Sequence, residues 1–84
     1  MEKGIIYFSA PWCGPCKTLG PIMDVLEGEG VKIKKVNCDY DTNLSQQYKV
    51  KSVPTLVLTD LGGNELGRKV GVQSKQQILD WYNG

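Results

Sequence analysis

Short apolar runs and a turn signal along the chain predict four β-strands. Gly4–Phe8 and Thr55–Thr59 are rich in β-branched or aromatic residues, which is typical of buried strands. Val31–Asn37 alternates apolar residues with lysines and predicts a further strand. Leu61–Asn64 contains two glycines and an asparagine, so we expect a turn there, with Glu65–Val70 as the returning partner of a hairpin.

A helix is predicted around and after the second of two closely spaced cysteines. Beyond Cys16, apolar residues recur at the positions i, i+3, i+4 and i+7 that line one helix face, namely Leu19, Ile22, Met23 and Leu26. Gly28 and Gly30 end this pattern, as helix-terminating glycines do. Pro21 lies inside it and predicts a kink, because its ring removes a backbone hydrogen bond to the preceding turn.

Two further helices are marked by N-capping residues. Asp39–Asn43 is rich in side chains that cap helices and precedes a short segment carrying Leu44 and Tyr48. Ser74 and Gln77 have the spacing of a capping box, and they open a final helix whose apolar residues are Ile78, Leu79, Trp81 and Tyr82. The whole order of elements is then β-α-β-α-β-β-α.

This order predicts an α/β fold built on one four-stranded mixed sheet. The first strand-helix-strand unit forms a right-handed crossover between parallel strands, and the hairpin adds an antiparallel pair. Helices on both faces of the sheet, three in all, give the simplest closure. At 84 residues the chain has room for one core, so we expect a single domain over residues 1–84.

Composition excludes several classes of function. The net charge is +1 and the lysines are spread along the chain, so nothing indicates a nucleic-acid or membrane-surface partner. The longest apolar run is far shorter than a membrane span, and the N-terminus enters a strand directly instead of a signal sequence. Three cysteines do not suit a secreted disulfide framework. We therefore expect a cytoplasmic protein.

The segment Trp12-Cys13-Gly14-Pro15-Cys16 carries the candidate chemistry. Two cysteines three positions apart at a helix start lie one turn from each other, so their sulfurs can alternate between a disulfide and a dithiol. The preceding strand and tight turn favour a redox motif. Zinc normally needs four ligands, and the chain offers no histidine and one other cysteine, so no metal site is expected.

The two cysteines are expected to have different roles. Cys13 lies at the helix N-terminus, where free N–H groups and the helix dipole lower the pKa of a thiol, so it is the candidate nucleophile. Its thiolate would attack a substrate disulfide to give a mixed disulfide. Cys16, expected one turn deeper and less exposed, would then attack Cys13 and release the reduced substrate.

Five segments, in order and in spacing, resemble the thioredoxin family. Ala10–Lys17 is similar to the active-site signature of thioredoxins, and the other four are Pro21, Lys35–Asn37, Ser52–Thr55 and Val70–Val72. The resemblance spans nearly the whole chain. It implies a thioredoxin fold with strand order 2-1-3-4, and a thiol-disulfide oxidoreductase that needs no cofactor beyond its own redox disulfide.

The resemblance also implies roles for residues around the cysteines. Gly14-Pro15 goes with a reducing potential in the family. Trp12 is expected to contact partner proteins, with ordinary packing over the loop as the alternative. Pro54 is expected to be cis and to present the Val53 backbone to an extended substrate, with Gly71 as the opposite wall. The alternative for Pro54 is a trans proline at the start of a strand, and the alternative for Gly71 is an ordinary turn glycine.

Two departures from the family pattern concern length and Tyr7. The chain lacks the N-terminal strand and helix of full-length thioredoxins and so resembles minimal forms nearer glutaredoxins in size. Tyr7 stands where thioredoxins usually have a buried aspartate, and a phenol with an ordinary pKa of about 10 is a poor base at neutral pH. Lys35, in the position of that aspartate's usual partner, either lowers a cysteine pKa or extends into solvent. Both residues are therefore candidates for setting the redox potential of the cysteine pair.

Three other polar or reactive side chains have plainer interpretations. Cys38 follows the second strand, and a small buried hydrophobe is favoured there over a regulatory thiol. Lys17 and Lys49 are expected to be solvated surface charges rather than catalytic groups.

Together these inferences predict a monomeric protein-disulfide reductase that is re-reduced by a flavin-dependent thioredoxin reductase. Ribonucleotide reductase is a candidate client, from the family's usual substrates. A glutaredoxin-like protein re-reduced by glutathione is the alternative; the short length favours it, and Gly14-Pro15 argues against it because glutaredoxins have a Pro-Tyr type of pair. A non-catalytic adaptor is a third hypothesis, and the intact pair of cysteines argues against it.

Overall fold

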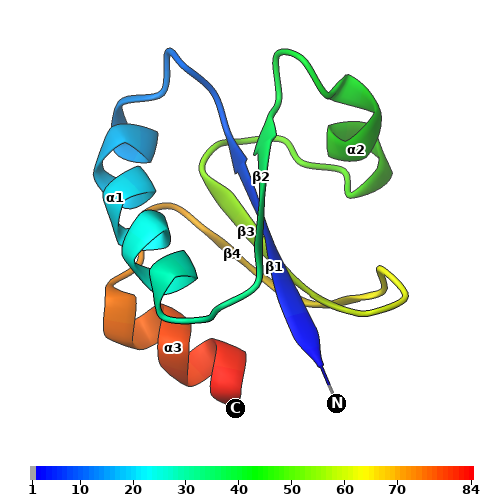
Figure 1. Ribbon diagram of the computed structural model, residues 1–84. Helices are drawn as coiled ribbons and strands as arrows, with labels where there is room; N and C mark the ends of the chain where they lie inside the picture. Colours follow the sequence, from blue (N-terminus) through cyan, green and yellow to red (C-terminus); the bar gives the residue numbers. More distant parts are fainter. Residues whose placement is uncertain (1) are drawn as a thin grey trace.

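The computed structural model describes residues 2–84, in which four strands form one mixed sheet and three helices cover its two faces (Figure 1). The elements are β1 (Lys3–Ser9), α1 (Gly14–Gly28), β2 (Ile33–Asn37), α2 (Thr42–Gln47), β3 (Thr55–Asp60), β4 (Glu65–Val70) and α3 (Lys75–Asn83). Both their order and the sheet order β2-β1-β3-β4 are those predicted from the sequence.

Strand register brings four connecting segments to one end of the sheet. β1 runs parallel to β2 and antiparallel to β3, and β3 is antiparallel to β4. Phe8, near the end of β1, lies opposite Val36 and Thr55, and Thr55 in turn lies opposite Val70. The segments that follow β1, β2 and β4 therefore meet the segment that precedes β3. All the candidate site residues outside the strands lie in these segments or in the first turn of α1.

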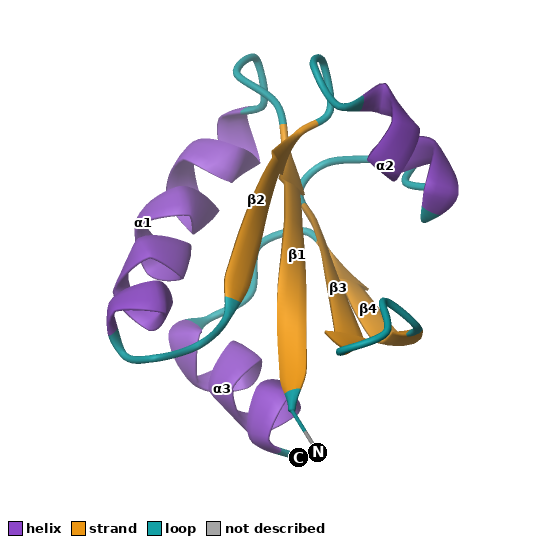
Figure 2. Ribbon diagram, turned by 45° about the vertical axis from the view of Figure 1, so that its right-hand side comes forward, coloured by secondary structure: helices purple, strands orange, loops and turns teal. Residues whose placement is uncertain are grey.

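The larger hydrophobic core lies on the face of the sheet that α1 and α3 cover (Figure 2). Its buried members are Ile5, Tyr7, Leu19, Met23, Leu26, Val31, Leu56, Leu58 and Ile78. Most come from alternate positions of β1 and β3 and from the apolar face of α1, as the two periodicities require. Ile78 comes from α3, and Val31 lies between α1 and β2. Burial of these apolar side chains therefore holds α1, the helix that carries Cys16, against the sheet along its length.

A smaller core lies on the opposite face, beneath α2. Its buried members are Ile6, Phe8, Val36, Tyr48 and Val57. The helix α2 contributes no buried residue of its own, and Tyr48 is its C-terminal cap rather than a residue inside it. Hydrogen bonds attach this region to the β3–β4 hairpin: the Tyr48 hydroxyl donates to the Gly63 carbonyl at 2.6 Å, and Arg68 donates to the Tyr48 carbonyl at 2.6 Å.

Local hydrogen bonds explain where the elements begin and end. The Ser74 hydroxyl accepts from the Gln77 N–H, and the Gln77 side chain accepts from the Ser74 N–H, which confirms the predicted capping box. Val31 was expected to begin the second strand, and this was wrong. Its N–H donates to the Leu26 carbonyl at 3.1 Å, so it closes the end of α1 and β2 begins at Ile33. Within residues 2–84, no helix is both long enough and apolar enough to cross a membrane.

Candidate active site

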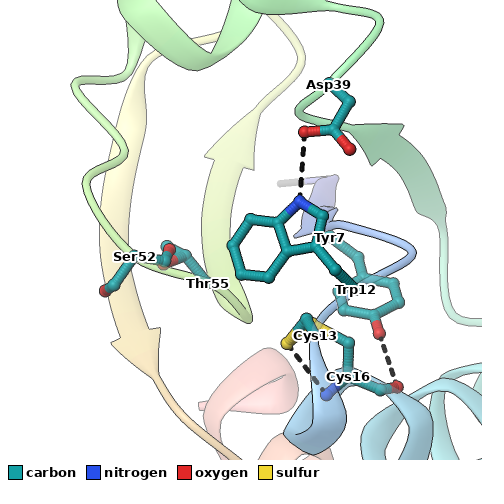
Figure 3. The surroundings of a disulfide bond; sticks show 7 residues. All are labelled: Tyr7, Trp12, Cys13, Cys16, Asp39, Ser52 and Thr55. Carbon is teal, nitrogen blue, oxygen red and sulfur yellow. Dashed lines mark hydrogen bonds between the residues drawn. A yellow bond between two sulfur atoms is a disulfide. The ribbon is translucent and has the colours of Figure 1, made fainter.

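Cys13 and Cys16 form a disulfide at the N-terminus of α1 (Figure 3). Cys13 is the N-cap residue: its backbone is extended, at φ −83° and ψ 112°, and its sulfur accepts a hydrogen bond from the Cys16 N–H at 3.2 Å. The Cα atoms are 5.3 Å apart. An N-capping sulfur that receives a helix N–H is where a thiolate gains most from the helix terminus. Gly14 and Pro15 complete the first turn and are exposed.

Both cysteines are buried, and the expected difference between them is not found. Cys13 is 3% exposed and Cys16 is 6% exposed, so the expectation that Cys16 is the less exposed was wrong. The two cysteines pack with Ala10, and Val53, from the segment before β3, packs against them. Val53 is forty residues from Cys13 in sequence. An expectation based only on the position of the cysteines in the helix does not include this contact.

The segment before β3 forms a wall beside the disulfide. The Val53–Pro54 peptide bond is cis, as expected. Thr55 donates from its hydroxyl to the Ser52 carbonyl at 2.7 Å, which closes the turn that carries Val53 (Figure 3). Gly71 lies next to this wall, because its N–H donates to the Pro54 carbonyl at 2.9 Å.

Gly71 also has a backbone that favours glycine. Its φ is +91°, in the left-handed region where a side chain is strained. A Cβ built at this position meets no other atom within 4 Å, so the space beside it is open. Gly71 therefore leaves the backbone accessible at the end of β4.

Trp12 is exposed and is tethered by a residue that the sequence reasoning did not single out. The residue is 71% exposed, and its indole N–H donates to Asp39 at 3.3 Å (Figure 3). Asn37 accepts from the Asp39 N–H at 2.9 Å and so fixes the start of this loop. The position of Asp39 just after the second strand, at the end of the sheet that carries the cysteines, is the signal that could have identified it.

A pocket of about 280 Å³ lies between this tryptophan and α2. Its lining residues are Trp12, Cys38, Thr42, Ser45, Gln46, Val50, Lys51, Ser52 and Val53. Cys38 packs against the smaller core, as expected of a small hydrophobe, but it is partly rather than completely buried. Cys38 is therefore both a neighbour of the smaller core and a lining residue of the pocket.

Tyr7 lies beneath the first turn of α1. Its side chain is buried, and its hydroxyl donates to the Cys16 carbonyl at 3.1 Å (Figure 3). Burial raises the pKa of the Tyr7 phenol, and the hydrogen bond from Ser9 only partly opposes this. Tyr7 is therefore a protonated hydrogen-bond donor at neutral pH, in agreement with the expectation that it is a poor base there.

Lys35 has partners that neither alternative from the sequence included. It forms ion pairs with Asp24 and, at 3.8 Å, with Glu27, both on α1. The hydrogen bond to Asp24 raises the pKa of Lys35. Its charge is thus compensated at a half-exposed position instead of being directed at a cysteine. Lys17 and Lys49 are exposed, as expected.

Among residues 2–84, no group of three or more histidine, cysteine, aspartate or glutamate side chains is placed to hold a metal ion. The reactive group of the site is the disulfide between Cys13 and Cys16.

Comparisons with known proteins agree with this geometry. The family model for thioredoxin matches residues 1–83. A thioredoxin from Rickettsia felis is 40% identical over 82 residues, which are 94% of this chain and 77% of that protein. A thioredoxin from Chlamydia caviae is 43% identical over 81 residues, 94% of this chain and 78% of its own length.

Solved structures show the same relationship. A variant thioredoxin from Halobacterium salinarum has a TM-score of 0.89 and 31% identity, covering 98% of this chain and 73% of that one. Fasciola hepatica thioredoxin has a TM-score of 0.87 and 27% identity, covering 98% of this chain and 79% of that one. The fold and the paired cysteines define a thiol-disulfide oxidoreductase. The chain belongs to the thioredoxin family, with protein-disulfide reductase activity.

Proposed function

We propose that this chain is a small cytoplasmic thioredoxin whose single domain, residues 1–84, reduces disulfides in client proteins through Cys13 and Cys16. One observation carries the assignment of roles. The Cys13 sulfur caps the helix and accepts the Cys16 N–H at 3.2 Å. A thiolate at this position is stabilised by the helix N-terminus, so Cys13 is the better nucleophile of the pair.

The reaction proceeds in two exchanges. The Cys13 thiolate attacks one sulfur of the client disulfide, a bond forms between Cys13 and that sulfur, and the second client sulfur leaves with the electron pair and takes a proton from water. Cys16 then loses its proton to water and attacks the Cys13 sulfur. The first client sulfur leaves, so the client gains two electrons and the chain is left with the Cys13–Cys16 disulfide.

Client binding is assigned to the surface around the disulfide. The backbone of Val53, next to cis-Pro54, can pair with an extended client segment as an added strand. Gly71 leaves room on the opposite side because its missing side chain keeps the backbone accessible. Trp12 supplies an exposed aromatic contact. Gly14-Pro15 sets the geometry of the first turn and, as in the family, favours a reducing potential.

Electrons are proposed to come from thioredoxin reductase, with the chain acting as a monomer. Ribonucleotide reductase is one candidate among the disulfide-containing clients. Re-reduction by glutathione is the competing assignment, and a comparison of electron donors separates the two.

Insulin reduction tests the proposal. Wild type with NADPH and thioredoxin reductase is expected to precipitate the insulin B chain, and Cys13→Ser is expected to be at background. A second arm replaces the reductase with glutathione and glutathione reductase, and its rate is expected to be much lower. Equal rates of wild type and Cys13→Ser would reject the reductase function, whereas a faster glutathione arm would reject only the proposed electron donor.

A further inference from the structure

A buried phenol contacts the backbone of the second active-site cysteine. Tyr7 is 4% exposed as a residue and belongs to the larger core, so the position of its side chain under α1 is fixed by packing. Its hydroxyl donates to the Cys16 carbonyl at 3.1 Å in a buried hydrogen bond (Figure 3). The bond joins β1 to the first turn of α1, two segments that a loop separates in sequence.

This contact lies beside a gap in the backbone hydrogen bonds of α1. A helical carbonyl normally receives the N–H four residues on, and residue 21 is a proline without an N–H. The carbonyl of Lys17 therefore lacks its helical partner, and the turn that carries Cys16 is joined to the next turn by fewer bonds. The Tyr7 hydroxyl donates to the carbonyl immediately before that gap.

We propose that Tyr7 is a positioning residue for the resolving step: its phenol holds the Cys16 carbonyl, and with it the first turn of α1, in the orientation that brings the Cys16 sulfur to Cys13. This inference rests on the proposed function and deepens it. The hydrogen bond is present with the disulfide closed, which is the geometry that the resolving attack must reach. An intramolecular attack depends steeply on such alignment.

The step that Tyr7 assists transfers no proton to or from its hydroxyl. Cys16 gives its proton to water, its sulfur forms the bond to Cys13, and the client sulfur leaves with the electron pair. The first exchange needs only Cys13 and the client, so Tyr7 affects the second exchange and not the first.

The chain contains a matched control. The Tyr82 hydroxyl also donates to a backbone carbonyl at 3.1 Å, that of Lys3, and its ring packs against the same core. Lys3 is at the other end of β1 from Tyr7. Tyr82→Phe and Tyr7→Phe therefore remove the same kind of bond and keep the same ring, but only one of them does so beside the cysteines.

The experiment uses the reduced protein and dithionitrobenzoate, an aromatic disulfide whose released thiolate is coloured. Attack by Cys13 releases one equivalent at a rate that rises with reagent concentration. Attack by Cys16 releases the second at a rate independent of that concentration. A Cys13→Ser/Cys16→Ser variant gives the signal of Cys38 for subtraction.

Tyr7→Phe is expected to slow the second release by about three- to tenfold, the range for losing one hydrogen bond, and to leave the first within about twofold of wild type. Tyr82→Phe is expected to leave both rates unchanged while lowering the urea midpoint by less than Tyr7→Phe does, because its hydrogen bond is only partly buried. An unchanged second release in Tyr7→Phe, or an equal slowing in Tyr82→Phe, would overturn the role of Tyr7 alone. No second release in wild type would overturn the resolving role of Cys16 and the positioning role together.

Discussion

The two faces of the sheet hold their helices in different ways. On one face, α1 and α3 bury apolar side chains against alternate positions of β1 and β3. On the other, α2 is only six residues long, buries none of them, and depends on a cap and on hydrogen bonds to the hairpin. The redox cysteines start the helix of the first face, whereas the second face supplies most of the lining of the pocket beside Trp12.

This difference relates to what each face does. A disulfide that opens and closes needs both sulfurs held in one geometry, and a well-packed helix provides this. The helix α2 has few buried contacts, and segments of this kind open at low free-energy cost. We expect the following substitutions to separate the two faces, in decreasing order of effect.

Truncation of a buried leucine gives the largest contrast. Leu26→Ala, at a fully buried position of α1, is expected to lower the free energy of unfolding by about 2–5 kcal/mol, because it leaves a cavity in the larger core. Leu44→Ala, at a half-buried position of α2, is expected to cost about 1 kcal/mol or less. Urea unfolding at neutral pH measures both. Equal losses would show that the two faces contribute alike.

Two glycines with the same kind of backbone test whether Gly71 belongs to the client surface. Gly71 and Gly30 have φ values of +91° and +100°, and a Cβ at either meets nothing within 4 Å. Alanine at each is therefore expected to cost about 1–2 kcal/mol of stability through backbone strain. Only Gly71→Ala is expected to raise the KM for insulin, by several-fold. A similar KM in the two variants would remove Gly71 from the proposed surface.

Removal of the N-caps tests how local the attachment of α2 is. Asp41 accepts the Leu44 N–H at 3.1 Å on α2, and Ser74 accepts the Gln77 N–H at 3.1 Å on α3. Each alanine variant is expected to lose about 1 kcal/mol of helix stability. In Ser74→Ala this should lower the global unfolding midpoint, whereas in Asp41→Ala it should mainly speed amide exchange within α2. Amide exchange read residue by residue distinguishes the two, and a uniform increase in Asp41→Ala would argue against local opening.

Acid is expected to weaken the α2 face slightly through Glu65. Its hydrogen bonds from Arg68 lower the pKa of Glu65, and Arg68 also donates to the Tyr48 carbonyl at the end of α2. A lowered carboxyl pKa contributes stability that is full above the ordinary pKa of about 4.3 and is lost as the pH falls through the lower, folded-state value.

Glu65→Gln removes that titration. We expect the wild type to lose a few tenths of a kcal/mol more than this variant between pH 6 and about pH 3, since the pair is partly solvated. Urea unfolding of both proteins at the two pH values is the measurement. Equal losses of unfolding free energy in wild type and Glu65→Gln would show that the Glu65–Arg68 pair does not stabilise the fold.

The sequence by itself determined the elements and the reactive pair, because each has a local signal, and the resemblance to the thioredoxin family supplied the sheet order. Alternation and β-branched residues indicate strands, the spacing of Ser74 and Gln77 indicates a helix start, and two cysteines three apart at a helix start indicate a redox pair. The predicted start of the second strand was wrong because one backbone N–H had two candidate hydrogen-bond acceptors. The Val31 N–H went to the carbonyl of Leu26 and not to the sheet, and nothing in the local pattern decides between them.

Only the tertiary structure decided which side chains meet. Tyr7 and Lys35 lie opposite each other in adjacent strands, yet the phenol donates to Cys16 and the ammonium group pairs with Asp24. Cys13 is covered by Val53, and Trp12 is tethered by Asp39. These contacts join segments brought together by strand register and helix packing. Their partners are selected by distance and direction in the folded chain, which residue spacing along the sequence does not contain.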